Sequence, residues 1–269
     1  SDTNFGRNTT ITASTTITTD RLTSGAAVNH TLGTLSQGTF TLTTTAGSNI
    51  TSGTAGLTFG GTTFTGNPTF TTNSGTRLSL GALTDGGAAR TITKAGAGIL
   101  RFLSAATSWA TASDALTINR GTVELAANNA FGTGTNTNVT INSTTAGETA
   151  LFDLAGFNQS IGTLTFGGTG GTATSTNNLA TGAGTLTLGG NVTYTNTNNP
   201  LGSTISGNLA LGSATRTFTI NDSTNSTAEL TIDAIISGTG GLTKAGTGRL
   251  VLNGDNTYSG TTTLTTGTL

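Results

Sequence analysis

The chain has 269 residues, of which 69 are Thr and 41 are Gly, while 10 Lys or Arg and 11 Asp or Glu supply all the charge. The charged fraction of 8% is far below the quarter or so that is usual for soluble domains. With a net charge of -1, the chain offers no basic surface for nucleic acid or for an anionic membrane. It has no Cys, which excludes a disulfide framework and thiolate chemistry.

Nothing in the sequence divides the chain into parts. It has two prolines and no charge run, so we expect residues 1–269 to form one continuous body. No window approaches the roughly 20 consecutive apolar residues that span a bilayer, and no membrane insertion is predicted within this segment. Residues 1–5 show neither an initiator Met nor a signal-peptide pattern, so we expect a processed or excised chain.

Apolar residues recur at every second position with Thr between them. A period of two places both apolar side chains on one face of a strand and the Thr on the other. Thr suits the outer face because its branched Cβ favours extended backbone. In chain order the predicted half-buried strands are centred on Phe40-Thr41-Leu42, Leu57-Thr58-Phe59, Leu116-Thr117-Ile118, Val139-Thr140-Ile141, Leu186-Thr187-Leu188, Val192-Thr193-Tyr194, Phe218-Thr219-Ile220 and Leu230-Thr231-Ile232.

The recurrence of these short strands favours a stacked-repeat architecture. Gly, Asn and Ser clusters such as 196–199 separate the strands and predict turns. Two or three strands would make a coil of roughly 20 to 30 residues, which gives about ten coils and a rod of about 50 Å. We predict an all-β fold, a parallel β-helix (β-solenoid) that forms a single elongated rod. A β-sandwich is the alternative, disfavoured because the hairpin signal Asn-Gly occurs once, at Asn253-Gly254.

Two stretches of the chain, 90–125 and 236–269, are copies of one repeat. The second copy contains Gly241-Leu242-Thr243-Lys244-Ala245-Gly246-Thr247-Gly248, then Asn256-Thr257-Tyr258-Ser259-Gly260, and ends on Gly267-Thr268-Leu269. The first copy reads Thr91-Ile92-Thr93-Lys94-Ala95-Gly96-Ala97-Gly98 and continues to Gly121-Thr122-Val123-Glu124-Leu125. Both copies resemble the passenger-associated transport repeat of autotransporter proteins.

The resemblance implies a right-handed parallel β-helix on the outside of a Gram-negative type cell. Passengers of this family are normally exported through a C-terminal outer-membrane barrel. We therefore expect an extracellular or outer-cell-surface location in a Gram-negative type bacterium. Since 1–269 shows no barrel pattern of its own, we expect a stem without its translocator.

Within the repeat, Gly246 and Gly248 are expected to flank a tight corner that needs small or left-handed residues. Lys94 and Lys244 occupy equivalent positions in the two copies. They would form a ligand-binding ladder or, as we prefer, remain solvated and discourage edge pairing. Tyr258 is expected to cover the end of the apolar column of its coil.

The sequence holds few residues that could carry chemistry. His30 is the single histidine, so a multi-histidine metal site is impossible and a catalytic triad would depend on it alone. We expect it in a loop or turn. Glycoside cleavage needs two carboxylates at a defined separation, and Asp222, Glu229 and Asp233 are the candidates, although solvated or salt-linked surface acids are favoured. No phosphate-loop, dinucleotide or calcium motif occurs, so we predict no catalytic residue, no metal, no cofactor and no enzyme.

The two termini look like two parts of one interrupted motif. Residues 1–6 resemble 129–132, and residues 267–269 stop inside the phrase that 121–125 continues. Solenoids normally close each end with a polar cap, and neither end looks capped. The chain is expected to be a window of a longer repeat protein or a subunit that stacks head to tail. The candidate end-to-end interface consists of Ser1, Asp2, Asn4, Phe5, Leu264, Gly267 and Leu269.

We favour a non-enzymatic structural segment of a secreted or cell-surface fibre, stalk or autotransporter-type adhesin, whose partner is itself or an adjacent repeat segment. One alternative is a carbohydrate-active β-helix enzyme. Another is a binding module whose Thr/Asn-rich face holds a host or environmental glycan or another flat periodic surface. That last function requires Thr aligned over many coils, and the uneven spacing of the triplets argues against such an alignment.

Overall fold

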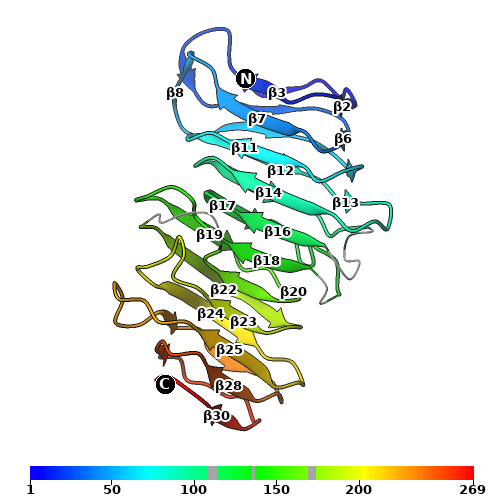
Figure 1. The fold of residues 1–269 in the computed structure, drawn as a ribbon. Helices are drawn as coiled ribbons and strands as arrows, with labels where there is room; N and C mark the ends of the chain where they lie inside the picture. Colours follow the sequence, from blue (N-terminus) through cyan, green and yellow to red (C-terminus); the bar gives the residue numbers. More distant parts are fainter. Residues whose placement is uncertain (108, 110–113, 135–136, 169–173) are drawn as a thin grey trace.

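The computed structural model describes residues 1–107, 109, 114–134, 137–168 and 174–269. None of these residues is helical, and their thirty strands pair only in parallel. Figure 1 shows the strands stacked into an elongated rod with the two termini at opposite ends. The predicted all-β parallel solenoid is confirmed, and the β-sandwich is excluded because its neighbouring strands would pair antiparallel.

Two long sheets run along the rod, and two short sheets flank its N-terminal coils. Among the described residues, sheet I has thirteen strands: β1 (Thr3–Asn4), β5 (Asn29–Thr31), β9 (Ala55–Thr58), β12 (Thr76–Leu80), β15 (Ile99–Phe102), β17 (Gly121–Leu125), β19 (Thr149–Asp153), β20 (Gln159–Ile161), β22 (Thr176–Leu188), β24 (Ser203–Ala210), β26 (Leu230–Ile232), β27 (Ile235–Ser237) and β29 (Leu250–Leu252).

Sheet II has eleven described strands, and they follow chain order without interruption: β3 (Thr15–Thr19), β7 (Thr41–Ala46), β11 (Thr69–Thr72), β14 (Thr91–Ala95), β16 (Ala115–Ile118), β18 (Asn138–Ile141), β21 (Leu164–Phe166), β23 (Val192–Tyr194), β25 (Arg216–Ile220), β28 (Leu242–Ala245) and β30 (Thr262–Leu264). The short sheets contain β2 (Thr9–Ile11), β6 (Leu35–Gln37), β10 (Thr62–Phe64) and β13 (Leu83–Thr84), and then β4 (Gly25–Ala26) and β8 (Ile50–Ser52).

The register of sheet II shows how long each coil is. The longest steps between paired residues join Thr41 to Thr69 and Leu164 to Val192. The shortest joins Leu242 to Thr262. Coil lengths therefore fall in the predicted range. Because the strands of sheet II pair without a register shift, the extra residues of the longer coils lie outside this sheet, in loops and in a bulge of β22 between Ala180 and Thr185.

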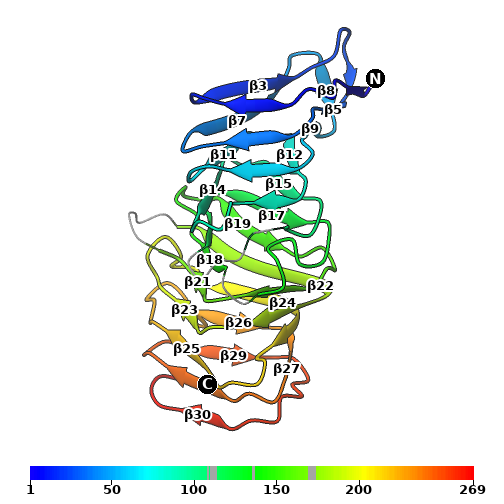
Figure 2. The same ribbon diagram turned by 90° about the vertical axis from the view of Figure 1, so that its right-hand side faces the viewer.

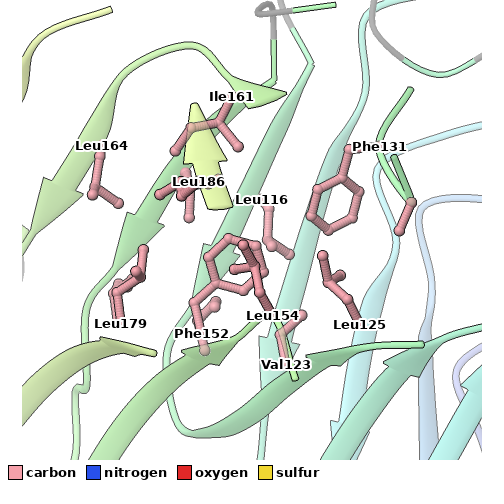
Figure 3. Packing of buried hydrophobic residues seen from close by; sticks show 14 of the residues in the cluster. Leu116, Val123, Leu125, Phe131, Phe152, Leu154, Ile161, Leu164, Leu179 and Leu186 are labelled. Carbon is pink, nitrogen blue, oxygen red and sulfur yellow. The ribbon is translucent and has the colours of Figure 1, made fainter. Parts of the chain in front are cut away.

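The interior of the rod is a continuous column of apolar side chains. Figure 3 shows residues of its central part pointing inward from successive strands. Phe131 packs between Phe102 and Phe152, with ring centroids 5.0 and 6.0 Å away. Each such burial stabilises the fold by about 1.5–3 kcal/mol. The apolar members of the predicted triplets are buried, apart from Phe40, which is 38% exposed. It precedes the first residue of β7, where the backbone is still turning, so its expected inward position was wrong.

The outer face of sheet II aligns Thr residues along the rod. The unbroken column comprises Thr41, Thr69, Thr93, Thr117, Thr140, Thr165, Thr193 and Thr219, and we call it the threonine ladder. Ala245 follows it. The expectation that uneven spacing prevents such alignment was wrong, because the variable residues lie between the strands and leave the register of sheet II intact.

Candidate functional site

His30 is half-buried in a strand near the N-terminal end of the rod. It belongs to β5, in register between Thr3 and Leu57, so the expected loop or turn position was wrong. Its Nε2 lies 2.7 Å from the backbone oxygen of Asp20, and its ring meets the Phe5 ring edge-on at 5.6 Å. The imidazole thus bonds a carbonyl instead of a hydroxyl nucleophile, and this arrangement is not that of a catalytic triad.

Two of the three candidate carboxylates accept hydrogen bonds from separate partners, and the third, Asp222, is exposed at the surface as expected. Glu229 is 2% exposed, and its two oxygens accept from the backbone amides of Ser223 at 3.3 Å and Arg249 at 2.6 Å. Asp233 accepts from the side-chain amide of Asn253 at 2.7 Å. Glu229 is therefore a buried acid that orders backbone, which corrects its expected surface position. Among the described residues, no three His, Cys, Asp or Glu are grouped to hold a metal ion.

The two repeat lysines are buried, so both sequence-based interpretations of them were wrong. Lys94 and Lys244 lie in register with inward positions of sheet II, and each is 0% exposed. The Lys94 ammonium donates to the backbone oxygens of Ala95 at 2.8 Å, Gly96 at 2.6 Å and Arg120 at 2.9 Å. Its three protons thus meet three acceptors. Two acceptors belong to its own coil and the third to the next coil.

Lys244 repeats this geometry in the second copy of the motif. Its ammonium donates to the oxygens of Ala245 at 2.9 Å, Gly246 at 2.8 Å and Thr266 at 3.1 Å. Burial lowers the pKa of Lys244 from its usual value. Burial, together with the nearby Arg120 charge, lowers the pKa of Lys94 to about 7. Each lysine joins two coils at one corner, and we call this arrangement the lysine corner.

Each lysine corner also requires a glycine from the following coil. Gly121 has a φ of +72°, and a Cβ there would lie 2.5 Å from the Gly98 oxygen and 2.6 Å from the Gly96 oxygen. Gly267 has a φ of +79° and packs against the corresponding oxygens of Gly246 and Gly248. The expected tight corner at Gly246 is confirmed by its φ of +79°. In each copy of the repeat, the glycines after the lysine and the later glycine therefore form the corners of two successive coils, stacked on each other.

Asp85 and Asp114 form a second buried polar site. They are 2% and 0% exposed, and their Oδ1 atoms accept from the backbone amides of Gly87 at 2.7 Å and Arg90 at 2.8 Å. Burial raises the pKa of Asp85, and the charge of Asp114 and a hydrogen bond with it raise this pKa further. The sequence does not reveal this pair, because the two residues lie in consecutive coils and share no local motif.

The candidate end residues lie at the two opposite ends of the rod (Figure 2). Phe5, Leu264 and Leu269 are 53%, 52% and 44% exposed. At the N-terminal end, Asp2 accepts from the Asn29 amide at 2.8 Å, Asn4 accepts from the Gly6 amide at 2.9 Å, and the Ser1 oxygen accepts weakly from Thr3 at 3.5 Å. At the other end, Gly267 belongs to the second lysine corner.

The N-terminal coils also form an open pocket of about 270 Å3. Phe5, Ile17, His30, Leu32 and Leu57 are among the residues that line it. At the C-terminal end, Tyr258 packs against the core cluster and shares a hydrogen bond of 2.5 Å with Thr262. No helix in the described part of the chain has the length and apolar character needed to cross a bilayer.

Comparison with known proteins agrees with the repeat motif. Residues 92–125 and 242–269 match the Passenger-associated-transport-repeat family, so the resemblance of the two copies to this repeat is confirmed. The chain is also 40% identical over 112 residues to the adhesin BmaC autotransporter of Brucella suis biovar 1 (strain 1330). This similarity covers 42% of the chain and 3% of the adhesin. No solved structure matches the chain.

Proposed function

We propose that this chain is a non-enzymatic structural segment of an adhesin-type passenger, secreted or displayed on the outer surface of a Gram-negative bacterium. The observation that carries the proposal is the lysine corner, which occurs in both segments that match the passenger repeat. The similarity to an autotransporter adhesin supports it. A rod of parallel coils around a continuous apolar column suits a stalk because every coil is stabilised by its neighbours.

Surface labelling tests the proposed location. Antibodies raised against residues 1–269 are expected to label intact, unpermeabilised cells of the source bacterium, and protease added outside the cells is expected to remove the label. A periplasmic protein, detected only after permeabilisation, serves as the control. Label that appears only in permeabilised cells would contradict an external stalk.

A glycan-cleavage screen tests the absence of enzymatic activity. We expect no turnover, because Glu229 bonds two backbone amides and Asp233 bonds Asn253, so these candidates do not form the acid and base pair that glycoside cleavage needs. The paired Asp85 and Asp114 are buried, which keeps a glycan away from them. If turnover appears and is lost in His30→Ala, Asp222→Ala, Glu229→Gln or Asp233→Asn, the carbohydrate-active alternative holds instead.

End-to-end stacking is the finer part of the proposal. Exposed Phe5 at one end and exposed Leu264 and Leu269 at the other would be covered by a further coil of the same or an adjacent segment. Sedimentation of purified protein is expected to show elongated oligomers that disappear in Phe5→Asp and Leu264→Asp. Leu201→Asp is the matched control, since Leu201 is 51% exposed between β23 and β24, away from both ends of the rod. Unchanged sedimentation of the end variants would reject stacking.

A host or environmental glycan is the second candidate partner, favoured by the uncharged hydroxyl row of the threonine ladder. Binding to an array of neutral polysaccharides, lost on replacement of Thr140 and Thr165 by Lys, would support it. If no glycan on the array binds, the structural role of the rod as a stalk would remain as the proposed function.

A further inference from the structure

The two faces of the rod differ in charge. The outward side of sheet I carries Arg77, Arg101, Glu124 and Asp153, with Arg101 and Glu124 paired at 3.3 Å. In the described strands of sheet II, the outward positions hold Thr, Asn and Ala and none carries a charge. Lys94 and Lys244 of the same sheet point inward, and Arg216 donates to the oxygens of Leu211 and Gly189.

Polar columns accompany the threonine ladder on this face. One neighbouring column contains Thr91, Ala115 and Asn138 in register and is continued by Thr217, Thr243 and Thr263 in the last coils. The Asn138 side chain accepts from the amide and hydroxyl of Thr163 in the next coil, at 2.9 and 2.8 Å. These bonds hold the edge of the face in position. The ladder residues themselves are half-buried, so part of each side chain is exposed to solvent.

We propose that this uncharged face packs against the same face of a second copy of the chain, so that rods associate side by side. The inference does not depend on export or on end-to-end stacking. A Thr hydroxyl both donates and accepts a hydrogen bond, so two identical ladders are complementary to each other. Juxtaposed like charges would oppose such pairing, and sheet II presents none on its outer face in the described strands.

Among uncharged partners, the regular spacing of the coils favours a second copy of the same chain. Coils repeat at about 4.8 Å along the rod, and another copy has the same repeat, so a hydroxyl that meets a hydroxyl at one coil meets one at every coil. A partner of different repeat would lose this register after a few steps. The eight ladder residues span seven steps, or about 34 Å at that spacing.

The area of the face predicts a weak and reversible contact. A face of that length and about three outward columns wide covers roughly 500 Å2 per copy, below the 800 Å2 or so of a standard stable interface. Many rods held side by side on one surface would gain from effective concentration. Isolated chains are therefore expected to associate only at high concentration.

Charge insertion tests the proposal. Thr140 and Thr165 pair directly in the middle of the ladder, so Thr140→Lys/Thr165→Lys gives one variant and Thr140→Glu/Thr165→Glu another. All chains also carry Phe5→Asp and Leu264→Asp, which block end stacking. The matched control is Thr204→Lys/Thr231→Lys, a half-buried, directly paired Thr couple on the outer face of sheet I. Circular dichroism and the melting temperature check that every variant folds.

Sedimentation velocity from micromolar to millimolar concentration is the measurement. The parent chain and the sheet I control are expected to form dimers as concentration rises, whereas the Lys and Glu variants alone remain monomeric. A mixture of the Lys and Glu variants is expected to regain association at low salt and to lose it in 1 M salt, where the screening length is about 3 Å. A parent chain that stays monomeric, a control that behaves like the ladder variants, or a mixture without rescue would overturn the proposal. The proposal would also be overturned if the Lys and Glu variants lost glycan binding but kept their self-association.

Discussion

Lys94 supplies all three ammonium protons to backbone oxygens in a buried corner. Replacing it with Met preserves most of the buried volume and leaves three carbonyl groups without donors. An unsatisfied buried group costs about 1–3 kcal/mol, so we expect Lys94→Met to lose at least about 3 kcal/mol. For a chain of this size the melting temperature should fall by about 6 °C or more. Arg7→Gln is the control, because it also removes one positive charge but from an exposed side chain. If Lys94→Met melted at the same temperature as the parent chain, the three carbonyl oxygens would have to accept hydrogen bonds from other donors.

The buried Asp85–Asp114 pair predicts a pH dependence. The pKa of Asp85 is raised in the folded chain by burial and by Asp114. Its contribution to stability is therefore fully present below the unfolded value of 3.8 and is lost as pH rises through the raised folded value. Asp85→Asn keeps the oxygen that accepts from Gly87 and removes one charge, so it should melt at a higher temperature than the parent chain at pH 7.

Melting curves between pH 4 and pH 7 check this expectation. The difference between Asp85→Asn and the parent should shrink toward acid, since the parent regains its proton there. Asp153→Asn is a useful control, because Asp153 lies on the outer face of sheet I and bonds the Ala155 amide at 2.8 Å. A constant difference across the pH range would argue against a raised pKa of Asp85 in the folded chain.

Residue pattern predicted the strands but not the roles of the charged residues. Alternation places Leu116 and Ile118 inward because a period of two is a local property of the strand. The burial of Lys94 depends on three backbone oxygens, one of them in the next coil, at Arg120. An inward register position followed by Ala-Gly is the signal that distinguishes it, and only the structure shows the acceptors. His30 shares this difficulty, since its inward place follows from pairing with Leu57.

At the scale of elements, the lysine corner depends on close approach between coils. Gly121 and Gly75 both have a φ of +72°, but a Cβ at Gly75 would meet nothing within 4 Å. Gly75→Ala therefore measures the left-handed backbone cost, about 1–2 kcal/mol. Gly121→Ala adds the clash with two backbone oxygens and should lose at least about 2 kcal/mol more, in line with overpacking elsewhere. Urea unfolding of the two variants gives the comparison, and equal losses would show that the coils can separate at this corner.

Register is the other property of elements that the sequence does not reveal. The triplets are unevenly spaced because the coils differ in the number of residues between successive strands of sheet II. Strand pairing absorbs these differences, so Thr140 meets Thr117 and Thr165 directly. A pattern along the chain cannot show this, since the number of corner residues is not fixed by alternation. The threonine ladder therefore emerges only once the coils are stacked.

At the scale of the whole molecule, the rod is a linear chain of contacts. Each coil packs mainly on the coil before and the coil after it, so stability is a sum of local terms. Among the described strands of sheet II, the end strands have one neighbour each: β30 pairs with β28 alone and is exposed throughout, whereas β18 pairs with β16 and β21. Amide hydrogen exchange is therefore expected to be slow in the middle coils and faster toward both ends.

A substitution that creates a cavity in the middle of the rod should destabilise mainly the neighbouring coils. Phe152 is fully buried and its ring lies 6.0 Å from that of Phe131, so Phe152→Ala should cost about 3–5 kcal/mol. Because coupling runs through neighbouring coils, hydrogen exchange should accelerate most in β17, β19 and β22, with little change in β28. Phe5→Ala, at an exposed end position, should affect only the first coils. A uniform acceleration from β3 to β28 in the Phe152 variant would instead mean that the rod unfolds as one cooperative unit, and the nearest-neighbour description would fail.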